Sequence, residues 1–593
     1  MPVVAPLKGE ARAAFKTLEK YGGDYSQLTD LARMCAALPA ARSVPDPPHT
    51  PIPTHPPHLS ADCVVVCVCD RTVQCTTLKD VKAVLKMLGS HAGFKVLLIK
   101  NRLMLAFDAS VSGGYRDLLI NLRCLATGHI FELQITLKAL IDVKAGGYAS
   151  YAVARMHGLF QRETYHYEGA LGDAVLEGVR CGVVRELVFN GKASGLAAHF
   201  DSLLVSLRSP ACGLRELQLI ECDWPKGHTL SELVEALPAR GLRHLEITDM
   251  EVGGTLPKAL GEKCAGVVYM DLDSLGLTGG VPASLGKCTK LKKLMLHANQ
   301  LSGRIPDELG QCGELEMLQL QTNQLVGGVP ASLGKCIKLK SLQLYKNQLD
   351  GPIPDELGYC CELESLGLAM NQLTGCVPAS LGKCTKLKWL QLFTNQLEGV
   401  IPDEFGKCGE LEMLQLQTNQ LVGGVPATLG KCAKLKTLAL FKNHLEGTIP
   451  DELGQCVELE SLNLAMNSLA GNVPASLGKC TKLKRLSLFK NQLEGPIPDE
   501  LGQCGELEVL ELAMNQLTGG VPASLGQCAR LKELLLFKNQ LKGAVPWTAL
   551  AALTALEVLQ LHQNEALTIT SKGVQTLKEA LPNAQLKLPK DYG

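Results

Sequence analysis

The sequence is poor in aromatic residues and has no excess of charge of either sign. Phe, Trp and Tyr make up 4% of the 593 residues, and 59 Lys and Arg side chains balance 59 Asp and Glu side chains. A balanced charge argues against a general nucleic-acid binder and against adsorption to a membrane surface. Few aromatics together with 58 glycines argue against a single large conventional core.

Long apolar segments are also missing. The N-terminus, MPVVAPLKGEARAAF, has no basic start followed by an apolar region, so it lacks the pattern of a secretory signal. The longest apolar run, CVVVCVC at 63–69, is too short to span a membrane. We therefore expect no membrane partner and a cytoplasmic location, a reducing compartment in which the 23 cysteines remain thiols.

What the sequence has in abundance is one repeated unit. Asparagine recurs every 24 residues within the pattern LxxLxLxxNxLxGxxP. The positions are Asn299, Asn323, Asn347, Asn371, Asn395, Asn419, Asn443, Asn467, Asn491, Asn515 and Asn539. The segment LxxLxL predicts a short strand with its leucines inward, and such strands would stack in parallel about 4.8 Å apart. We expect the asparagine to turn the chain and to bond backbone groups of the neighbouring coil.

This pattern resembles that of leucine-rich repeat proteins, and the LxGxIPxxLG segment is similar to their plant-type subclass. The resemblance implies an α/β fold in which parallel strands form a horseshoe-shaped solenoid. We place irregular repeats at 166–265, regular repeats at 266–546, and the last repeat with a C-terminal cap at 547–593. A cap is needed because each coil buries its apolar side only against its neighbours. Residues 570–589 predict a helix there.

A second period, of 48 residues, overlies the first. Units that begin PASLGKC have lysines, such as Lys338 and Lys340, where units that begin PDELG have glutamates, such as Glu362 and Glu364. Stacking therefore predicts Lys against Glu at each step of the array. Each exposed pair would contribute roughly 0.2–1 kcal/mol.

One cysteine per repeat forms a column of twelve, from Cys264 to Cys528. Adjacent coils would bring these thiols near disulfide distance, so a disulfide or metal ladder is one reading. The last unit has Leu553 in the same column, and free cysteine packs as a small apolar residue. We therefore predict reduced thiols in the core.

Aromatic side chains recur in every second repeat, after the third leucine of the strand. Strand alternation places this position on the inner, solvent-facing curve, with aromatics roughly 10 Å apart. The predicted partner-binding residues are Tyr345, Trp389, Phe393, Phe441, Phe489 and Phe537. Exposed aromatics on a concave surface are typical binding anchors, although duplicated side chains that merely cover one another are the alternative. We predict a protein–protein interaction scaffold that needs no cofactor and binds a protein on this open face.

Residues 1–165 predict a smaller mixed α/β domain. The segments FKVLLIK, YRDLLINLRC and HIFELQITL predict strands. The Pro-rich segment 35–71 breaks the pattern and predicts a disordered insert, or sequence retained through a gene-model error. Its histidines and cysteines match no standard zinc spacing.

Four segments of this domain resemble the synthetase domain of the RelA/SpoT family: LTDLAR (28–33), IKNRL (99–103), GGYRDLL (113–119) and ELQI (132–135). That family has a nucleotidyltransferase-like fold and transfers pyrophosphate from ATP to a guanine nucleotide. The resemblance implies that Asp30 and Glu132 hold Mg²⁺, with Glu132 helping to activate the attacking hydroxyl. It also implies that Tyr115 stacks on guanine and that Lys100 and Arg102 face phosphates.

The sequence departs from this family at three positions. Leu119 and Thr136 stand where the family has His and Arg, and Asp117 replaces a Ser. Losing a cation near a polyphosphate removes charge stabilisation that supplies much of such a rate. We therefore lean towards a domain without enzymatic activity. A guanine-nucleotide pyrophosphotransferase, or a nucleotide sensor, is kept as the alternative.

Overall fold

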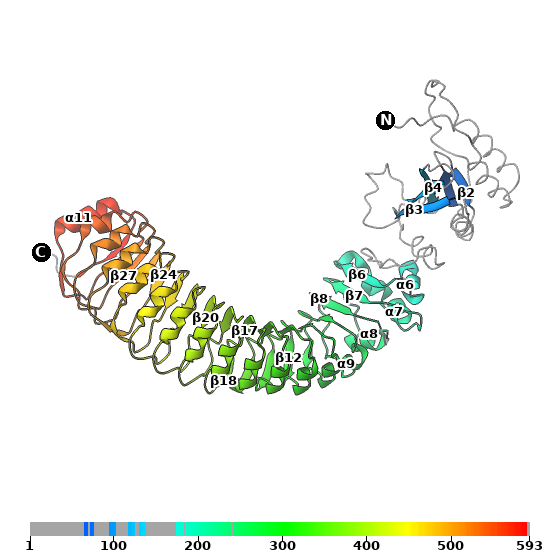
Figure 1. Cartoon of the computed structure of the whole chain (residues 1–593), viewed down its shortest axis with the longest axis horizontal. Coiled ribbons are helices and arrows are strands. Elements are labelled where there is room, and N and C mark those ends of the chain that lie inside the picture. Colours follow the sequence, from blue (N-terminus) through cyan, green and yellow to red (C-terminus); the bar gives the residue numbers. More distant parts are fainter. Residues whose placement is uncertain are drawn as a thin grey trace, which may run out of the picture. The chain divides into compact units, whose positions relative to one another are not determined.

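The computed structural model describes residues 173–182, 184–238 and 241–589, together with the backbone of five strands between residues 64 and 137 (Figure 1). The chain divides into two compact units, one of Met1–Phe189 and His199–Leu214, the other of Asn190–Ala198 and Arg215–Gly593. None of the helices in the described ranges has the length and apolar character needed to cross a bilayer.

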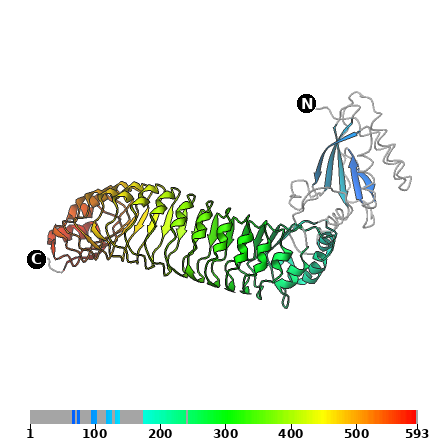
Figure 2. The same ribbon diagram turned by 60° about the horizontal axis from the view of Figure 1, so that its bottom comes forward.

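The first unit contains a five-stranded antiparallel sheet. Its strands are β1 (Val64–Val68), β2 (Thr72–Cys75), β3 (Phe94–Asn101), β4 (Asp117–Cys124) and β5 (Ile130–Leu137), in the order β2-β1-β5-β4-β3 (Figure 2). Apolar and β-branched residues dominate these segments, which favours extended backbone. Strands β3, β4 and β5 confirm the three strands predicted in this region.

Strand β1 corrects one prediction. It lies inside 35–71, the segment predicted to be a disordered insert, yet it pairs with both β2 and β5, with Val66 opposite Ile135. Four of its five residues are valine, whose branched side chain favours a strand. The predicted disorder is therefore wrong for residues 64–68, whereas the interpretation of 35–71 as an insert stays a prediction. The other residues of 35–71 lie outside the described part.

Between the sheet and the regular repeats, short helices alternate with strands. The elements are α6 (Asp173–Arg180), β6 (Glu186–Asn190), η1 (Lys192–Ser194), α7 (Leu196–Leu207), β7 (Glu216–Ile220), α8 (Leu230–Ala236), β8 (His244–Thr248), α9 (Leu260–Lys263) and β9 (Tyr269–Asp271). Strands β7, β8 and β9 pair in parallel within the second unit. Helix α8 begins after Thr229, whose hydroxyl accepts a hydrogen bond from the Glu232 N–H (3.4 Å).

The second unit continues with one three-residue strand per repeat. These strands are β11 (Lys293–Met295), β13 (Met317–Gln319), β15 (Ser341–Gln343), β17 (Ser365–Gly367), β19 (Trp389–Gln391), β20 (Met413–Gln415), β21 (Thr437–Ala439), β22 (Ser461–Asn463), β24 (Arg485–Ser487), β26 (Val509–Glu511), β27 (Glu533–Leu535), β29 (Val558–Gln560) and β31 (Gln585–Lys587). Neighbours pair in parallel and in register, with Leu342 opposite Leu366. In the green coils of Figure 1 the strands line the inner edge of the curve. The predicted parallel-stranded solenoid is confirmed.

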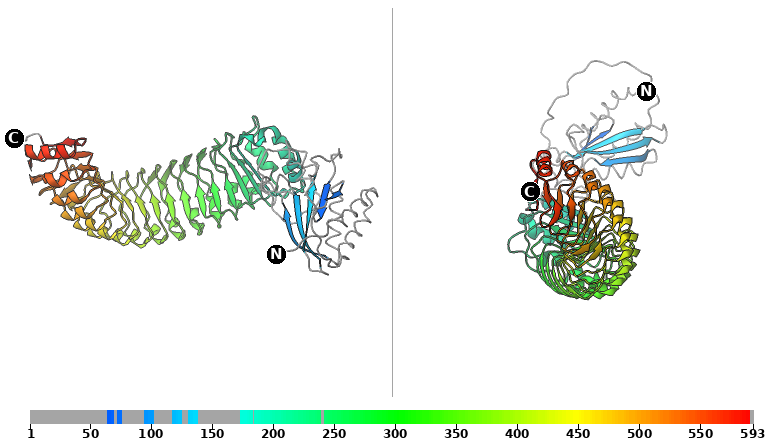
Figure 3. Two further views of the ribbon diagram at one scale, coloured as in Figure 1. Left: turned by 90° about the horizontal axis from the view of Figure 1, so that it is seen from above. Right: turned by 90° about the vertical axis from the view of Figure 1, so that its left-hand side faces the viewer.

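A second row of short strands accompanies this ladder. It comprises β10 (Thr278–Gly279), β12 (Gln300–Gly303), β14 (Gln324–Gly327), β16 (Gln348–Pro352), β18 (Gln372–Thr374), β23 (Ala470–Asn472), β25 (Gln492–Glu494), β28 (Lys542–Ala544) and β30 (Ala566–Thr568). Strands β10, β12, β14, β16 and β18 pair in parallel in this order and form one five-stranded sheet. Later in the array, β23 pairs with β25 and β28 pairs with β30. Figure 3 shows the coils stacked one behind another.

A 3-10 turn completes each regular coil. The turns are η2 (Ala283–Lys287), η3 (Asp307–Gln311), η4 (Ala331–Lys335), η5 (Asp355–Tyr359), η6 (Ala379–Lys383), η7 (Asp403–Lys407), η8 (Ala427–Lys431), η9 (Asp451–Gln455), η10 (Ala475–Lys479), η11 (Asp499–Gln503) and η12 (Ala523–Gln527). A proline precedes each turn and fixes the entering φ. Successive turns approach so closely that a Cβ on Gly310 would lie 2.3 Å from the Ser332 carbonyl oxygen, so glycine is required there.

The asparagine column links each coil to the one before it. The Nδ2 of Asn371 donates to the carbonyl oxygens of Leu344 (3.1 Å) and Leu368 (3.0 Å), and its Oδ1 accepts from the Leu349 N–H (3.0 Å). The same three contacts recur in neighbouring coils, as at Asn347. The predicted role of the column, which is to satisfy backbone groups of the adjacent coil, is confirmed.

The twelve cysteines of the column are buried, free thiols. The Cys312 thiol donates to the Leu285 carbonyl oxygen (3.4 Å), and burial raises the pKa of Cys312 to about 11. The group therefore stays protonated at neutral pH and packs as an apolar side chain. Leu553 is buried at the end of the same column, as predicted.

The C-terminal end is closed by α10 (Trp547–Ala551), α11 (Ser571–Ala580) and strand β31. The Thr570 hydroxyl caps α11 by accepting from the Gly573 N–H (3.1 Å). A helix was predicted for 570–589. The helix occupies the first part of that segment, and the chain then turns back so that β31 extends the ladder.

Candidate binding surface

The six predicted binding aromatics lie on the ladder side of the coils. Trp389 belongs to β19, and the other five follow the ladder strand of their repeat by two residues. Trp389 is 39% exposed, whereas the other five are half-buried. Because the strands are parallel and in register, those five form one column along the stack.

Alanine alternates with the aromatics in this column, except between Phe393 and Phe441, where the intervening residue is Gln417. Ala369, Ala465 and Ala513 are buried in the intervening coils. The rings of Phe489 and Phe537 lean towards each other across Ala513, with centroids 6.4 Å apart at 50°. This separation is shorter than the 10 Å expected from two strand spacings. Phe489 and Phe537 therefore cover one another in part, in line with the alternative interpretation, and each keeps some surface open to solvent.

The residue after the aromatic column has a left-handed backbone in every regular coil. Lys346 has φ of 54° and Met370 has φ of 56°, in a region of φ that favours glycine. A backbone bond supports this conformation, since the Lys346 N–H donates to the Ala369 carbonyl oxygen (3.0 Å). Met370 is 40% exposed. The column is thus bordered by exposed lysine and methionine side chains.

Paired charges form a separate row along the coils. Each acidic side chain contacts the basic side chain 24 residues later. The pairs are Lys338 with Glu314 (2.7 Å), Lys386 with Glu362 (2.6 Å), Lys388 with Glu364 (2.7 Å), Lys434 with Glu410 (2.6 Å), Lys436 with Glu412 (2.7 Å), Lys482 with Glu458 (2.6 Å), Lys484 with Glu460 (2.7 Å), Lys532 with Glu508 (2.8 Å), and Arg530 with Glu506.

These contacts correct the prediction of a pair at every step. An acidic coil contacts the basic coil that follows it, so the contacts above occur at every second step. Glu316 differs, because it binds Lys340 (2.8 Å) and also Lys292 of the preceding coil (2.9 Å). Hydrogen bonds from Lys340 and Lys292 lower the pKa of Glu316 to about 2. These rows are neutralised within the chain.

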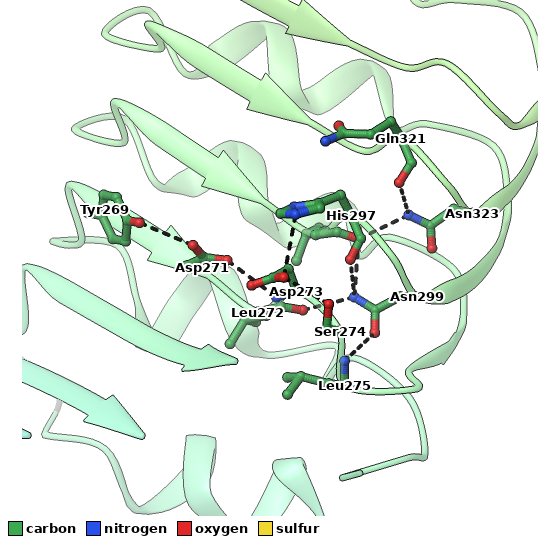
Figure 4. Close-up of polar contacts among 11 residues, drawn as sticks. Tyr269, Asp271, Leu272, Asp273, Ser274, Leu275, His297, Asn299, Gln321 and Asn323 are labelled. Atoms are coloured by element: carbon green, nitrogen blue, oxygen red, sulfur yellow. Dashed lines mark hydrogen bonds and ion pairs between the residues drawn. The ribbon is translucent and has the colours of Figure 1, made fainter. Parts of the chain in front are cut away.

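Acidic side chains without such partners lie at the start of the regular array. Asp271 ends β9, and Asp273 follows it at the position that His297 and Gln321 occupy in the next two coils (Figure 4). Asp271 is 6% exposed and accepts hydrogen bonds from the Tyr269 hydroxyl (3.1 Å) and the Asp273 N–H (3.3 Å). We call Tyr269, Asp271, Asp273, His297 and Gln321 the β9 cluster.

Electrostatics at the β9 cluster oppose a second negative charge. Burial raises the pKa of Asp271 to about 7, and the adjacent Asp273 carboxylate acts in the same direction. Burial, followed by the charge of Asp271, also raises the pKa of Tyr269, so its phenol stays protonated and donates. His297 Nε2 lies 3.4 Å from Asp273 Oδ2. Within the described ranges, no Lys or Arg forms an ion pair with either aspartate.

Two acceptor-capable atoms in the β9 cluster have no hydrogen-bond partner within the described residues. They are Oε1 of Gln321 and Nδ1 of His297. Gln321 is 7% exposed, and its amide lies beside the His297 ring (Figure 4). Unpaired buried polar atoms are uncommon in folded proteins, so each calls for a physical explanation.

Neighbouring strands extend this polar surface. The His244 ring of β8 lies 4.3 Å from the Tyr269 ring and contacts Glu246 (2.9 Å) and Glu216 (3.4 Å). Lys293 lies over the Tyr269 ring, with Nζ 5.8 Å from its centroid. In the described part of the chain, no three His, Cys, Asp or Glu side chains are arranged to hold a metal ion.

Reasoning from the sequence missed the β9 cluster. His297 and Gln321 occupy the position of the aromatic column in two earlier repeats, and neither they nor Asp271 and Asp273 were predicted to have a role. The available signal was DLDS at 271–274, which puts two acids on the solvent-facing positions of one ladder strand. Their burial and lack of a cation became visible only in three dimensions.

Two of the residues implied by the RelA/SpoT resemblance lie on described strands. Lys100 lies in β3, with Leu119 opposite, and Glu132 lies in β5, with Asn121 opposite. Strand β4 runs between β3 and β5, so the two positions are on non-adjacent strands. Asp30, Arg102 and Tyr115 lie outside the described residues. The roles of all five remain predictions.

Comparison with known families gives matches to leucine-rich repeats only. A model described as "Leucine rich repeat" matches residues 361–421, and a second such model matches 290–312, 338–360 and 482–504. No curated protein matches this chain. The second unit therefore contains leucine-rich repeats.

Solved structures that are similar to this chain include plant receptors. The plant peptide hormone receptor RGFR1, in complex with RGF2, is 29% identical with a TM-score of 0.60, over 70% of this chain and 68% of that one. The Arabidopsis receptor kinase HAESA, in complex with the hormone IDA and the co-receptor SERK1, is 27% identical with a TM-score of 0.55, over 72% and 77%. The Arabidopsis thaliana receptor kinase GASSHO1/SCHENGEN3 is 29% identical with a TM-score of 0.53, and this chain spans 54% of its length.

Proposed function

We propose that this protein is an interaction scaffold that binds an extended peptide segment of a partner protein along its ladder face. The observation that supports the proposal is the column of half-buried aromatics from Tyr345 to Phe537, with the more exposed Trp389 beside it. Aromatic rings that are rigid and partly desolvated supply much of the binding energy in protein interfaces.

The surface favours a peptide over a small molecule. The column extends over nine coils from Tyr345 to Phe537, which at about 4.8 Å per coil is roughly 38 Å. An extended chain of about twelve residues has that length. RGFR1 and HAESA, whose solenoids are similar, are described in complex with peptide hormones, which also supports a peptide partner.

The test uses a random peptide library displayed on phage and selected against the full chain. We expect selected peptides to lose at least roughly tenfold in affinity for Phe441→Ala/Phe489→Ala, because these rings lie in the column. The matched control is Glu362→Gln/Glu410→Gln, which alters the neutralised charge row. Equal affinity for the aromatic variant and the wild type would contradict the proposal.

We also propose that the protein works in the cytoplasm. Twelve column cysteines are reduced and sit one per coil, an arrangement that fits a reducing compartment. Iodoacetamide labelling with peptide mass spectrometry tests this on protein isolated from its native source under acid quench. Full labelling of the column after unfolding supports the proposal, and pre-formed disulfides in the column contradict it.

Nucleotide chemistry in the first unit is a second, separate proposal. It is supported by the resemblance of residues 28–135 to the RelA/SpoT synthetase and by the adjacency of β3, β4 and β5 in one sheet. Mg²⁺ would be held by Asp30 and Glu132 if the domain is active. Incubation of the full chain with Mg²⁺, ATP and GDP tests it. A pyrophosphorylated product that is lost in Glu132→Gln would support pyrophosphate transfer. Nucleotide binding without product would support a sensor. If the protein neither binds nucleotide nor forms product, both the transferase and the sensor proposals are wrong.

A further inference from the structure

We infer that the β9 cluster is the subsite for a cationic side chain of the partner peptide, with an arginine guanidinium as the best match. This inference rests on the proposed function, because it concerns the same face of the solenoid. It adds a chemical requirement to the peptide and a direction in which the peptide lies along the ladder.

The first argument is the balance of donors and acceptors. Asp271 is 6% exposed and receives hydrogen bonds only from neutral groups, the Tyr269 phenol and a backbone N–H. Asp273 accepts a hydrogen bond from the Ser274 hydroxyl (2.9 Å), and His297 Nε2 lies 3.4 Å from its carboxylate. A buried carboxylate without a positive partner is unfavourable, and a ligand that supplies the positive charge relieves that cost.

The second argument is independent of the acids. Gln321 is 7% exposed and its Oε1 has no hydrogen-bond partner among the described residues, although the amide lies beside His297 at the edge of the cluster (Figure 4). The site thus presents an amide oxygen without a donor beside carboxylates that receive hydrogen bonds but form no ion pair with a Lys or Arg of the described residues. A guanidinium offers five N–H donors and no acceptor, and it pairs with carboxylates in a bidentate way.

The third argument compares this site with the charge rows of the same solenoid. Glu314 and Glu362 each contact a lysine of the next coil, at 2.7 Å and 2.6 Å. At the β9 cluster the residues 24 positions after Asp271 and Asp273 are Met295 and His297, not lysines. The nearby Lys293 lies opposite Tyr269, with its Nζ over the Tyr269 ring. The acids of the charge rows thus contact basic side chains of an adjacent coil, whereas no Lys or Arg among the described residues forms an ion pair with Asp271 or Asp273.

The position of the cluster gives the peptide a direction. Lys442, Lys490 and Lys538 border the aromatic column towards the C-terminal coils, whereas the β9 cluster lies at the opposite end of the regular array. A bound segment would place its basic residue against Asp271 and Asp273 and its apolar residues over the rings. Asp273 and Phe441 are seven coils apart, roughly 34 Å at about 4.8 Å per coil, or about ten extended residues.

The experiment selects a library of random peptides of about sixteen residues, long enough to cover this span. Selection runs in parallel on the wild type, on Asp271→Asn/Asp273→Asn and on the control Glu314→Gln/Glu362→Gln. We expect Arg or Lys to be enriched at a fixed spacing from apolar residues on the wild type and the control, but not on the aspartate variant. Replacing that arginine by citrulline should weaken binding to the wild type at least fivefold and binding to the variant little.

The outcomes separate this inference from the proposed function. Peptides that depend on Phe441 and Phe489 but show no basic residue, or equal enrichment on the aspartate variant, would overturn the cationic subsite alone. Failure to select any peptide that depends on the aromatic rings would overturn both. Asp→Asn preserves shape, and a thermal unfolding midpoint at or above that of the wild type verifies that the variant is folded. If the double variant does not fold, Asp273→Asn alone serves in its place.

Discussion

Two buried amides of the solenoid, Asn371 and Gln321, have opposite surroundings. Asn371 is 9% exposed and uses its oxygen and its nitrogen in hydrogen bonds that join two coils. Gln321 is 7% exposed, and its oxygen has no partner within the described residues. The same contrast holds for acids, since Glu316 contacts two lysines and Asp271 contacts none. The bonded amide joins two coils, whereas the unpaired oxygen of Gln321 lies beside acids that form no ion pair with a Lys or Arg of the described residues, and this combination is what suits a ligand.

The largest effect should come from removing the bonded amide. Asn371→Ala leaves the Leu349 N–H without its partner, and an unpaired buried group costs about 1–3 kcal/mol. It also removes one of the two amide donors to the Leu344 and Leu368 carbonyl oxygens, which keep Asn347 and Asn395 respectively, and each lost hydrogen bond costs about 1 kcal/mol. We expect a loss of roughly 3 kcal/mol or more in the free energy of unfolding, measured by urea denaturation of the full chain. Gln321→Ala is the matched variant and should change this free energy by less than about 1 kcal/mol.

Equal losses in the free energy of unfolding for Asn371→Ala and Gln321→Ala would contradict this contrast between the two amides. That result would mean that Gln321 is as important for stacking as Asn371, and the unpaired oxygen would lose its significance as a ligand contact. The affinity for a library-selected peptide provides a second measurement. Gln321→Ala should weaken peptide binding directly, whereas Asn371→Ala should lower the free energy of unfolding.

An intermediate effect, opposite in sign, is expected at Asp271. Its pKa is raised to about 7, so between about pH 4 and pH 7 the folded protein retains a proton that the unfolded chain releases. Stability from this group is therefore present below about pH 4 and lost as the pH rises through about 7. Asp271→Asn should stabilise the protein at about pH 8 and much less at about pH 4.5, measured by urea denaturation at both values.

A stabilisation by Asp271→Asn that is equal at both pH values would contradict this account, because it would arise from something other than ionisation. Ser461→Ala is a suitable control, since Ser461 is a half-buried neutral residue of β22 on the same face of the ladder. Its effect should not vary with pH.

The smallest effect is expected in the charge rows. Glu316→Gln removes contacts to two lysines, and Glu362→Gln removes contacts to one. Both losses should be several-fold smaller than that of Asn371→Ala, because exposed ion pairs contribute little. The Glu316 loss should be the larger of the two and should diminish at about 1 M NaCl. The pKa of Glu316 is about 2, so its contribution is present above about pH 4.5 and lost as the pH falls through about 2.

Most of the repeat architecture was predictable from the sequence. The 24-residue period, the inward leucines, the asparagine contacts and the buried cysteines follow from local pattern, because every coil repeats the same environment. The structure differs from the predictions where side chains of the adjacent coil determine the orientation of a side chain. The ion pairs lean in one direction, and Phe489 approaches Phe537 more closely than strand spacing implies, since side-chain orientation depends on the adjacent coil.

In the N-terminal region, prediction from the sequence was limited by strand pairing between distant segments. The three strands β3, β4 and β5 were predicted because each segment is rich in apolar and β-branched residues, but Val64–Val68 was assigned to an insert because the segment around it is Pro-rich. Pairing with β5 places these valines in the sheet, and pairing between segments about 70 residues apart has no signature in a local window.

The sequence by itself determined that this chain stacks repeats, because the leucines, asparagines and glycines at fixed spacing permit little else. Tertiary structure decided where the chain leaves polar groups unpaired. Asp271, Asp273, His297 and Gln321 come from three successive coils and gather only when parallel strands lie side by side. Burial and the absence of a counter-charge are properties of that arrangement, so they could not be read from any one repeat.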